Sequence, residues 1–167
     1  MTNNKTSKMF TISFGEPITV PVLVPVVHNY TPECINNPVI VNGEWYKITA
    51  MSLGDPHGAV FVEDVDKVDV QALGPALGNH VIFPKGANIV FIQVLDKNNV
   101  KARLWQRGEG EAVFTAEAAC VTGIAAMICQ KTPFSEISVS MGGNIFQMEW
   151  NRGKREVTLT GAEKLLA

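Results

Sequence analysis

The chain has 167 residues, of which 46% are hydrophobic and 18% are charged, and its formal net charge is -2 at pH 7. This length favours one domain, or one domain with a tail, and the composition supplies enough apolar residues for a sizeable core. Because the charge is nearly balanced and the basic residues are scattered, nothing indicates a nucleic-acid partner or an anionic membrane.

Residues 1–8 are polar and predict a disordered tail, followed by a single domain over residues 9–167. Since the N-terminal residues lack the apolar core of a signal peptide, we expect a cytoplasmic protein. An odd number of cysteines favours reduced thiols over a disulfide framework. The histidines and cysteines lack metal-ligand spacing, so we expect no metal. These residues are His28, His57, His80, Cys34, Cys120 and Cys129.

The first part of the chain predicts strands joined by turns. Strand patterns occupy residues 9–14, 39–41, 44–51 and 59–63. Asn42-Gly43 is the strongest two-residue hairpin signal, because both positions tolerate positive φ. Residues 20–27 are apolar but contain two prolines, which predicts an edge segment or an extended crossing. Residues 52–58 predict a polar turn, and we expect His57 to be a turn residue with a satisfied hydrogen bond.

A helix is predicted over residues 68–79, with Asp64 and Asp66 as candidate caps. Leu73 and Leu77 are four residues apart and fall on its inner face. A hairpin is then expected in the middle of the chain, and a three-stranded meander near its end. The strands of these two units are residues 89–96, 100–105, 136–141, 145–150 and 156–160.

Between the hairpin and the meander, the chain predicts a helix that is buried on every side. Thr115 is its expected N-cap, and Glu117 falls in the first turn, where the helix dipole favours a negative charge. From residue 118 to residue 129 only Thr122 is polar, and the run is too short to span a bilayer. The elements together predict an α+β domain in which an antiparallel strand barrel surrounds a central helix.

Three ordered motifs resemble diaminopimelate epimerases. Residues 53–58 read Leu-Gly-Asp-Pro-His-Gly and resemble the Gly-Asn-Pro-His segment of that family. Residues 86–91 resemble its Gly-x-Asn-x-x-Phe strand, and residues 105–111 are similar to its Glu-Arg-Gly-x-Gly-Glu-Thr loop. Several motifs in order are more specific than one short pattern. The resemblance runs from about residue 10 to the C-terminus and implies the C-terminal domain of a two-domain fold.

The resemblance also implies a chemistry, and this chain departs from it. In the family, two cysteines on opposite faces of an α-carbon exchange a proton, and helix N-termini hold the α-carboxylate of the substrate. The second of these cysteines falls on Thr115, so we expect no catalytic residue in this chain. The family's Gly-Ser/Thr-Gly falls on Ala116-Glu117-Ala118, where the carboxylate of Glu117 repels an anionic substrate.

The remaining substrate contacts of the family are partly kept. Its binding asparagine falls on Asp55, and the glutamate before its binding arginine falls on Gln106, whereas Asn88, Arg107 and His57 match the pattern. The candidate ligand-binding residues are therefore Asp55, Asn88, Gln106, Arg107, Thr115, Ala116 and Glu117.

Arg107 has two interpretations of equal weight. It can grip a carboxylate bidentately, or it can pair with Glu109 or Glu111 within its own turn. For Cys120 and Cys129 we expect core packing rather than nucleophilic work.

Three functional hypotheses follow. The first is a catalytically inactive pseudoenzyme domain that acts in binding or assembly and forms a homodimer. The second is one half of a split amino-acid epimerase of lysine biosynthesis, which needs a separate N-terminal domain and no cofactor. The third is a binding module for a cationic or amino-acid-like small molecule.

Overall fold

The computed structural model describes residues 8–27 and 32–162. The expected tail therefore lies outside the described residues except for Lys8, and so does His28. The strands are β1 Met9–Phe14, β2 Asn37–Val41, β3 Glu44–Ser52, β4 Pro56–Phe61, β5 Asn88–Asp96, β6 Asn99–Gln106, β7 Gly110–Ala112, β8 Glu136–Met141, β9 Asn144–Asn151 and β10 Glu156–Ala162. The helices are α1 Val70–Gly78 and α2 Ala116–Ile128, with short 3-10 turns η1 Pro21–Leu23 and η2 Val65–Lys67.

All ten strands belong to one sheet, and its order is β1-β10-β9-β8-β6-β5-β4-β3-β2, with β7 paired to β6. The mixed α+β class is confirmed, but the expected antiparallel barrel is wrong in two respects. The sheet is not closed, because β1 and β2 lie at its two ends. Two pairs, β4 with β5 and β6 with β8, are parallel. Each parallel pair is joined through a helix, which is the connection that parallel neighbours require.

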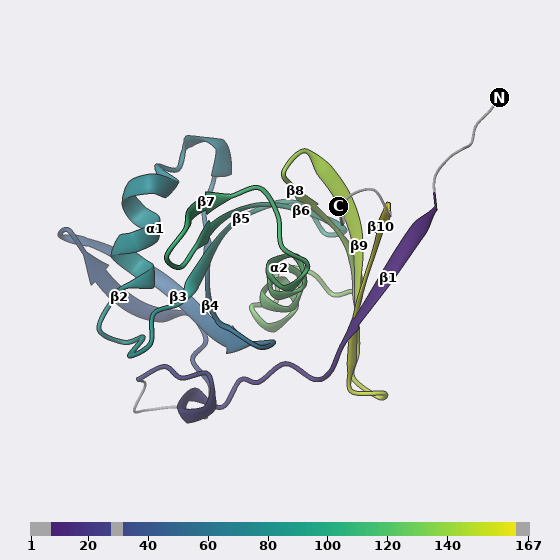
Figure 1. Cartoon of the computed structure of the whole chain (residues 1–167), viewed down its shortest axis with the longest axis horizontal. Coiled ribbons are helices and arrows are strands. Elements are labelled where there is room, and N and C mark those ends of the chain that lie inside the picture. The colour runs from purple at the N-terminus through teal and green to yellow at the C-terminus, as the bar shows by residue number, and fades with distance from the viewer. Residues whose placement is uncertain (1–7, 28–31, 163–167) are drawn as a thin grey trace.

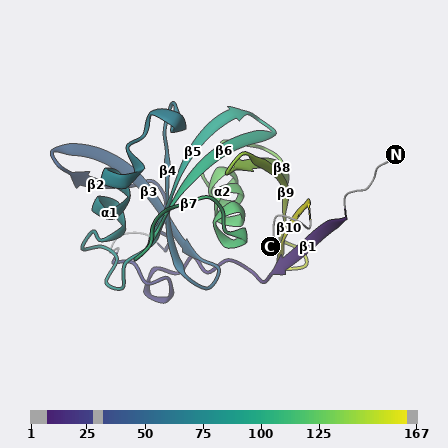
Figure 2. The same cartoon turned by 45° about the horizontal axis from the view of Figure 1, so that its top comes forward.

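The two helices lie on opposite faces of the curved sheet (Figures 1 and 2). Strand β5 shows why, because its side chains alternate between the faces. Val90 and Ile92 pack in the cluster of buried residues around α2, while Ile89 and Phe91 pack in the cluster beneath α1. A strand covered on both faces has no polar alternation, and this accounts for the continuous apolar run in β5.

Helix α2 is buried over nearly its whole length. Every residue from Ala118 to Ala126 is buried, and the helix packs against strands β3, β4, β5, β6, β8, β9 and β10. Among the described residues, no helix is long and apolar enough to cross a membrane.

The start of α1 differs from the prediction. Val68 is extended, with φ -75° and ψ 132°, so the chain forms the separate turn η2 before α1 begins at Val70. Asp64 caps η2, but the cap of α1 is Asp69, whose carboxylate accepts from the backbone N–H of Ala72 at 3.2 Å. The predicted caps of the long helix, Asp64 and Asp66, were therefore wrong.

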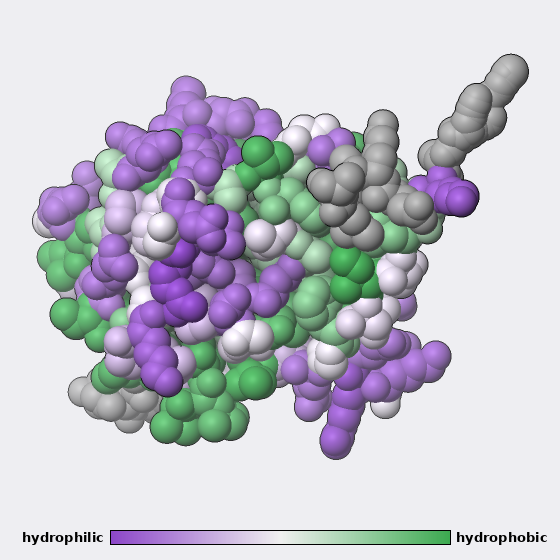
Figure 3. Space-filling model, in the orientation of Figure 1, coloured by the Kyte–Doolittle hydropathy of each residue, from purple (hydrophilic) through white to green (hydrophobic). Residues whose placement is uncertain are grey.

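The predicted hairpins are confirmed, and Asn42 and Gly43 both have positive φ. The predicted polar turn over residues 52–58 is too long, since β3 continues to Ser52 and β4 begins at Pro56, which pairs with Ser52. The apolar segment with two prolines forms η1, and an isolated bridge between Ile18 and Ser52 attaches the stretch before η1 to the sheet. Hydrophobic residues lie over η1 on the lower surface in Figure 3.

A candidate site at the N-terminus of helix α2

The hydroxyl of Thr115 caps the N-terminus of α2. Thr115 has extended backbone angles, and its Oγ1 accepts from the backbone N–H of Ala118 at 3.0 Å. The N-cap prediction is confirmed. The next residue, Ala116, is the first residue of the helix and is half-buried. Position 115 thus opens the helix at the place where the resemblance puts a cysteine.

The Glu117 side chain folds back over the turn between β3 and β4. Its Oε1 accepts from the backbone N–H of Asp55 at 3.2 Å, and its Oε2 lies 3.0 Å from the point that a Cβ on Gly54 would occupy. Gly54 has φ +142°, so this close approach uses a backbone conformation that a side chain would strain. Burial raises the pKa of Glu117, the Asp55 N–H lowers it, and the charge of Asp55 raises it.

His57 lies beneath this carboxylate, in strand β4 rather than in a turn. Its ring is fully buried, and burial lowers its pKa to about 4, so the imidazole is neutral at pH 7. Nδ1 lies 2.9 Å from the carbonyl oxygen of Asp55, which assigns the ring proton to Nδ1. Glu117 Oε1 lies 3.8 Å from Nδ1. With a neutral ring this contact is not an ion pair.

A chain of hydrogen bonds continues from His57 to the β6–β7 turn. The amide nitrogen of Asn88 lies 3.5 Å from Nε2 of His57, and that nitrogen is an acceptor in this tautomer. The amide oxygen of Asn88 accepts from the backbone N–H of Arg107 at 2.8 Å. Asn88 is buried at the start of β5, opposite His57 in the parallel ladder. Its amide is therefore held by the protein on both sides.

The guanidinium of Arg107 also has partners within the chain. Its Nη1 donates to the carbonyl oxygen of Lys85 at 2.6 Å, and its Nη2 lies 3.5 Å from Oδ1 of Asp55. The expected pairing with Glu109 or Glu111 is wrong, because Glu111 forms a bidentate pair with Arg103 across the β6–β7 hairpin. The sequence did not predict that short hairpin, which places the carboxylate of Glu111 against Arg103 instead of Arg107.

The structure therefore joins Asp55, Asn88, Arg107 and Glu117 in one network of linked contacts. Gln106 ends β6 and is half-buried, and its carbonyl oxygen accepts from the N–H of Glu109 at 3.0 Å. The central position of His57 did not follow from the sequence. It depends on the parallel pairing of His57 in β4 with Asn88 in β5, two residues far apart in the chain.

The cysteines lie apart from this network. Cys120 and Cys34 are fully buried, and burial raises their pKa values to about 12 and about 11. Cys129 is half-buried at the end of α2, 3.3 Å from Oγ1 of Thr49. Packing is thus the role of Cys120, as expected. Among the described residues, no cluster of three or more His, Cys, Asp or Glu side chains could hold a metal ion.

Comparisons with known proteins identify the family of the chain. The sequence model of diaminopimelate epimerase matches residues 49–166. A diaminopimelate epimerase of Leptospira biflexa is 35% identical over 98% of this chain and 57% of its own length. One from Oceanobacillus iheyensis is 34% identical over 99% of this chain and 57% of its own length. The chain thus spans a little more than half the length of these relatives.

A solved phenazine biosynthesis protein of the PhzF family from Bacillus anthracis has the same fold. It aligns with 95% of this chain and 59% of its own length, at a TM-score of 0.54 and 16% sequence identity. At this identity the likeness concerns the fold alone. The family match over most of the chain and the two epimerase relatives lead to one conclusion: the chain belongs to the diaminopimelate epimerase family.

Proposed function

We propose that this diaminopimelate-epimerase-like domain has no epimerase activity by itself and acts in binding or assembly. The observation that carries the proposal is the pair of contacts at the start of α2. The Thr115 hydroxyl accepts from the N–H of Ala118, and the Glu117 carboxylate accepts from the N–H of Asp55. A hydroxyl is too weak an acid to supply a base at neutral pH, and among the described residues this one has the backbone N–H of Ala118 as its hydrogen-bond partner.

Glu117 also supports the proposal through its charge. A helix N-terminus attracts anions, because its backbone N–H groups and dipole point outward. Here a carboxylate of the chain itself lies at that end, in contact with the turn at Gly54 and Asp55. A second carboxylate, from a substrate, would be repelled by Glu117 and would have to displace its contacts.

We propose a homodimer as the form in which the domain acts. Six exposed apolar residues form what we call the η1 surface: Ile18, Val20, Val22, Leu23, Val27 and Val81. The N–H of Val27 bonds to the carbonyl oxygen of Ile82, which brings the segment around η1 beside Val81. A contiguous apolar patch of this kind is typical of an interaction surface, and a two-fold contact would cover it in both copies.

The alternative is one half of a split epimerase of lysine biosynthesis, which would need a separate N-terminal domain. It is favoured by the retention of Asn88, Arg107 and His57 in an ordered network. The network also has an internal role, because each of its polar groups has a partner inside the chain.

If the domain binds a small molecule, the carboxylates of Asp55 and Glu117 would favour a cationic or amino-acid-like ligand over an acidic one.

Exchange of the α-proton of diaminopimelate in deuterated water tests the proposal. We expect no exchange with the wild-type chain, whether or not the N-terminal domain of the Leptospira biflexa relative is supplied. A variant with Thr115→Cys, Ala116→Gly, Glu117→Thr and Ala118→Gly, mixed with the same domain, is the positive control. Exchange by the wild-type chain with that domain would establish the split enzyme instead.

A further inference from the structure

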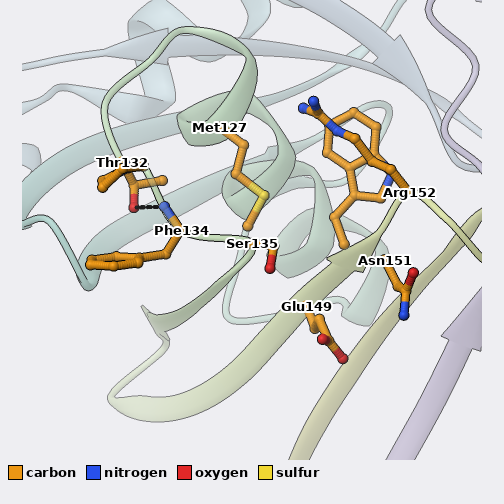
Figure 4. A pocket seen from close by; sticks show the side chains of 9 residues that line it. Met127, Thr132, Phe134, Ser135, Glu149, Asn151 and Arg152 are labelled. Carbon is orange, nitrogen blue, oxygen red and sulfur yellow. Dashed lines mark hydrogen bonds between the residues drawn. The ribbon is translucent and has the colours of Figure 1, made fainter.

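A cavity of about 410 Å³ lies at the other end of α2. Its walls come from Met127 in the last turn of the helix, from residues 132–135 and from the end of β9 (Figure 4). Met127 is ten residues beyond Glu117 in the same helix, which separates the two by about 15 Å along the axis. The cavity is therefore distinct from the site at the N-terminus of α2. Its volume falls within the range of small-molecule sites, about 300–1,000 Å³.

Trp150 lines the cavity and has an unused hydrogen-bond donor. Among the described residues, its Nε1 is the one buried side-chain nitrogen or oxygen without a hydrogen-bond partner. The guanidinium of Arg152 lies over the indole ring, 3.9 Å from the ring centroid. A buried donor without an acceptor is unfavourable, and such groups in folded proteins call for an explanation. An acceptor brought by a ligand would satisfy the indole N–H.

The charge around the cavity indicates which acceptor it would take. Arg152 forms no ion pair with a described residue and is exposed. Glu149 also lines the cavity, but Figure 4 shows its carboxylate pointing to the side opposite Arg152. Lys154 and Arg155 follow in the same β9–β10 turn and add positive charge. The donors and the positive charge both favour an anionic acceptor.

Three apolar residues, Met127, Pro133 and Phe134, share the rest of the wall with the polar residues Thr132, Ser135 and Asn151. Met127 extends between Thr132 and Arg152 in Figure 4, and Phe134 lies on the far side of Thr132. The Phe134 ring is 45% exposed. Thr132 is occupied internally, since it donates to the carbonyl oxygen of Lys97 and accepts from the N–H of Phe134. A methionine and an exposed ring beside a cation suit a ligand with an apolar body and one charged end.

We propose that this cavity binds a small organic carboxylate with an aromatic or branched apolar body. The carboxylate accepts from the guanidinium of Arg152, and the indole N–H of Trp150 is the second donor. The body packs against Met127 and Phe134. The proposal is independent of the function proposed above, because it uses none of the residues at the N-terminus of α2.

Indole resonances in a proton–nitrogen NMR spectrum test the proposal, with phenylacetate as the probe. The chain has three tryptophans, and Trp150→Phe identifies the resonance of Trp150. We expect phenylacetate to shift this resonance while those of Trp45 and Trp105 stay in place. Phenethylamine, which has a similar body and the opposite charge, is expected to leave all three unchanged.

Two arginine variants then separate a specific contact from general attraction. We expect Arg152→Gln to weaken phenylacetate binding at least tenfold, with the other resonances showing an intact fold. Arg155→Gln removes an equal charge from the same turn without touching the cavity, and we expect binding to change less than twofold. The proposal is overturned by an unmoved Trp150 resonance, by an equal response to phenethylamine, or by equal losses in the two variants.

Discussion

The pKa values of the half-buried Glu117 and the buried His57 shift in opposite directions. Burial is the largest cause for both, and it disfavours the charged form in each case. For Glu117 this raises the pKa, so the carboxylate loses its proton at a higher pH in the folded chain than in the unfolded one. For His57 it lowers the pKa, so its neutral form is favoured. The network at the start of α2 is thus neutral at His57 and holds its negative charge at Glu117 and Asp55.

His57 should make the chain less stable in mild acid. The unfolded chain binds a proton at the ordinary pKa of 6.5, whereas the folded chain does so only at about 4. The unfolded state therefore binds more protons between these values, and stability is lost as the pH falls from 6.5 to 4, by about 3 kcal/mol in all. Urea unfolding at a series of pH values measures this loss.

The variant His57→Gln isolates the effect, because glutamine keeps hydrogen-bonding groups and does not titrate. The raised pKa of Glu117 has the opposite effect, because it adds stability as the pH falls. This effect is present in both wild type and His57→Gln. We expect the difference between wild type and His57→Gln to shrink as the pH falls from 6.5 to 4. A difference in stability that stays constant over this range would show that folding does not lower the pKa of His57.

At the scale of elements, α1 approaches the sheet through glycines. A Cβ on Gly74 would lie 2.3 Å from Cγ and 2.6 Å from Cβ of Trp105, whose side chain is buried beneath the helix. These are the atoms nearest to the backbone, so they have little freedom to move. Close packing of α1 on β6 thus depends on the absence of a side chain at position 74.

We expect Gly74→Ala to destabilise the chain by about 1–3 kcal/mol, because overpacking outweighs the gain in helix propensity of about 1 kcal/mol. The matched control is Gly15→Ala, since a Cβ at Gly15 would meet no atom within 4 Å and its φ is not positive. Thermal unfolding of both variants is the measurement. A Gly74→Ala chain as stable as wild type would show that α1 shifts away from Trp105 without loss.

Local patterns predicted most elements and the hairpin pairs, but not the pairing of strands that are far apart in sequence. Strand β1 and the Asn42-Gly43 hairpin follow from alternation and turn chemistry, and both are confirmed. The beginning of β4 was missed, because Pro56 and His57 join the sheet through partners far away in sequence, including Asn88. The motif resemblance brought Asp55, Asn88 and Arg107 together. It did not reveal that the guanidinium of Arg107 donates hydrogen bonds to backbone carbonyl oxygens. Those contacts depend on the tertiary structure.

For the whole molecule, the exposed apolar residues around η1 bear on assembly. Val22 and Leu23 are 77% and 64% exposed, next to four other exposed apolar residues of the η1 surface. Ile145 is similarly exposed, at 67%, but it lies in β9 and does not belong to that surface. Ile145 shares a cavity wall with the exposed Val113, and this small pair is separate from the six residues of the η1 surface. A larger contiguous patch costs more free energy in water until another surface covers it.

We expect the wild-type chain to be a dimer at low micromolar concentration by light scattering. The double variant Val22→Asp and Leu23→Asp should raise the dissociation constant at least a hundredfold, because burying two carboxylates without partners is strongly unfavourable. Ile145→Asp should remain a dimer, since its added charge lies outside the contact. A monomeric wild type would contradict assembly through this surface, and a dimer in the double variant would place the contact elsewhere. An open sheet edge, such as that of β1, would then be the surface to vary next, because its unpaired backbone groups can join a strand of a second copy.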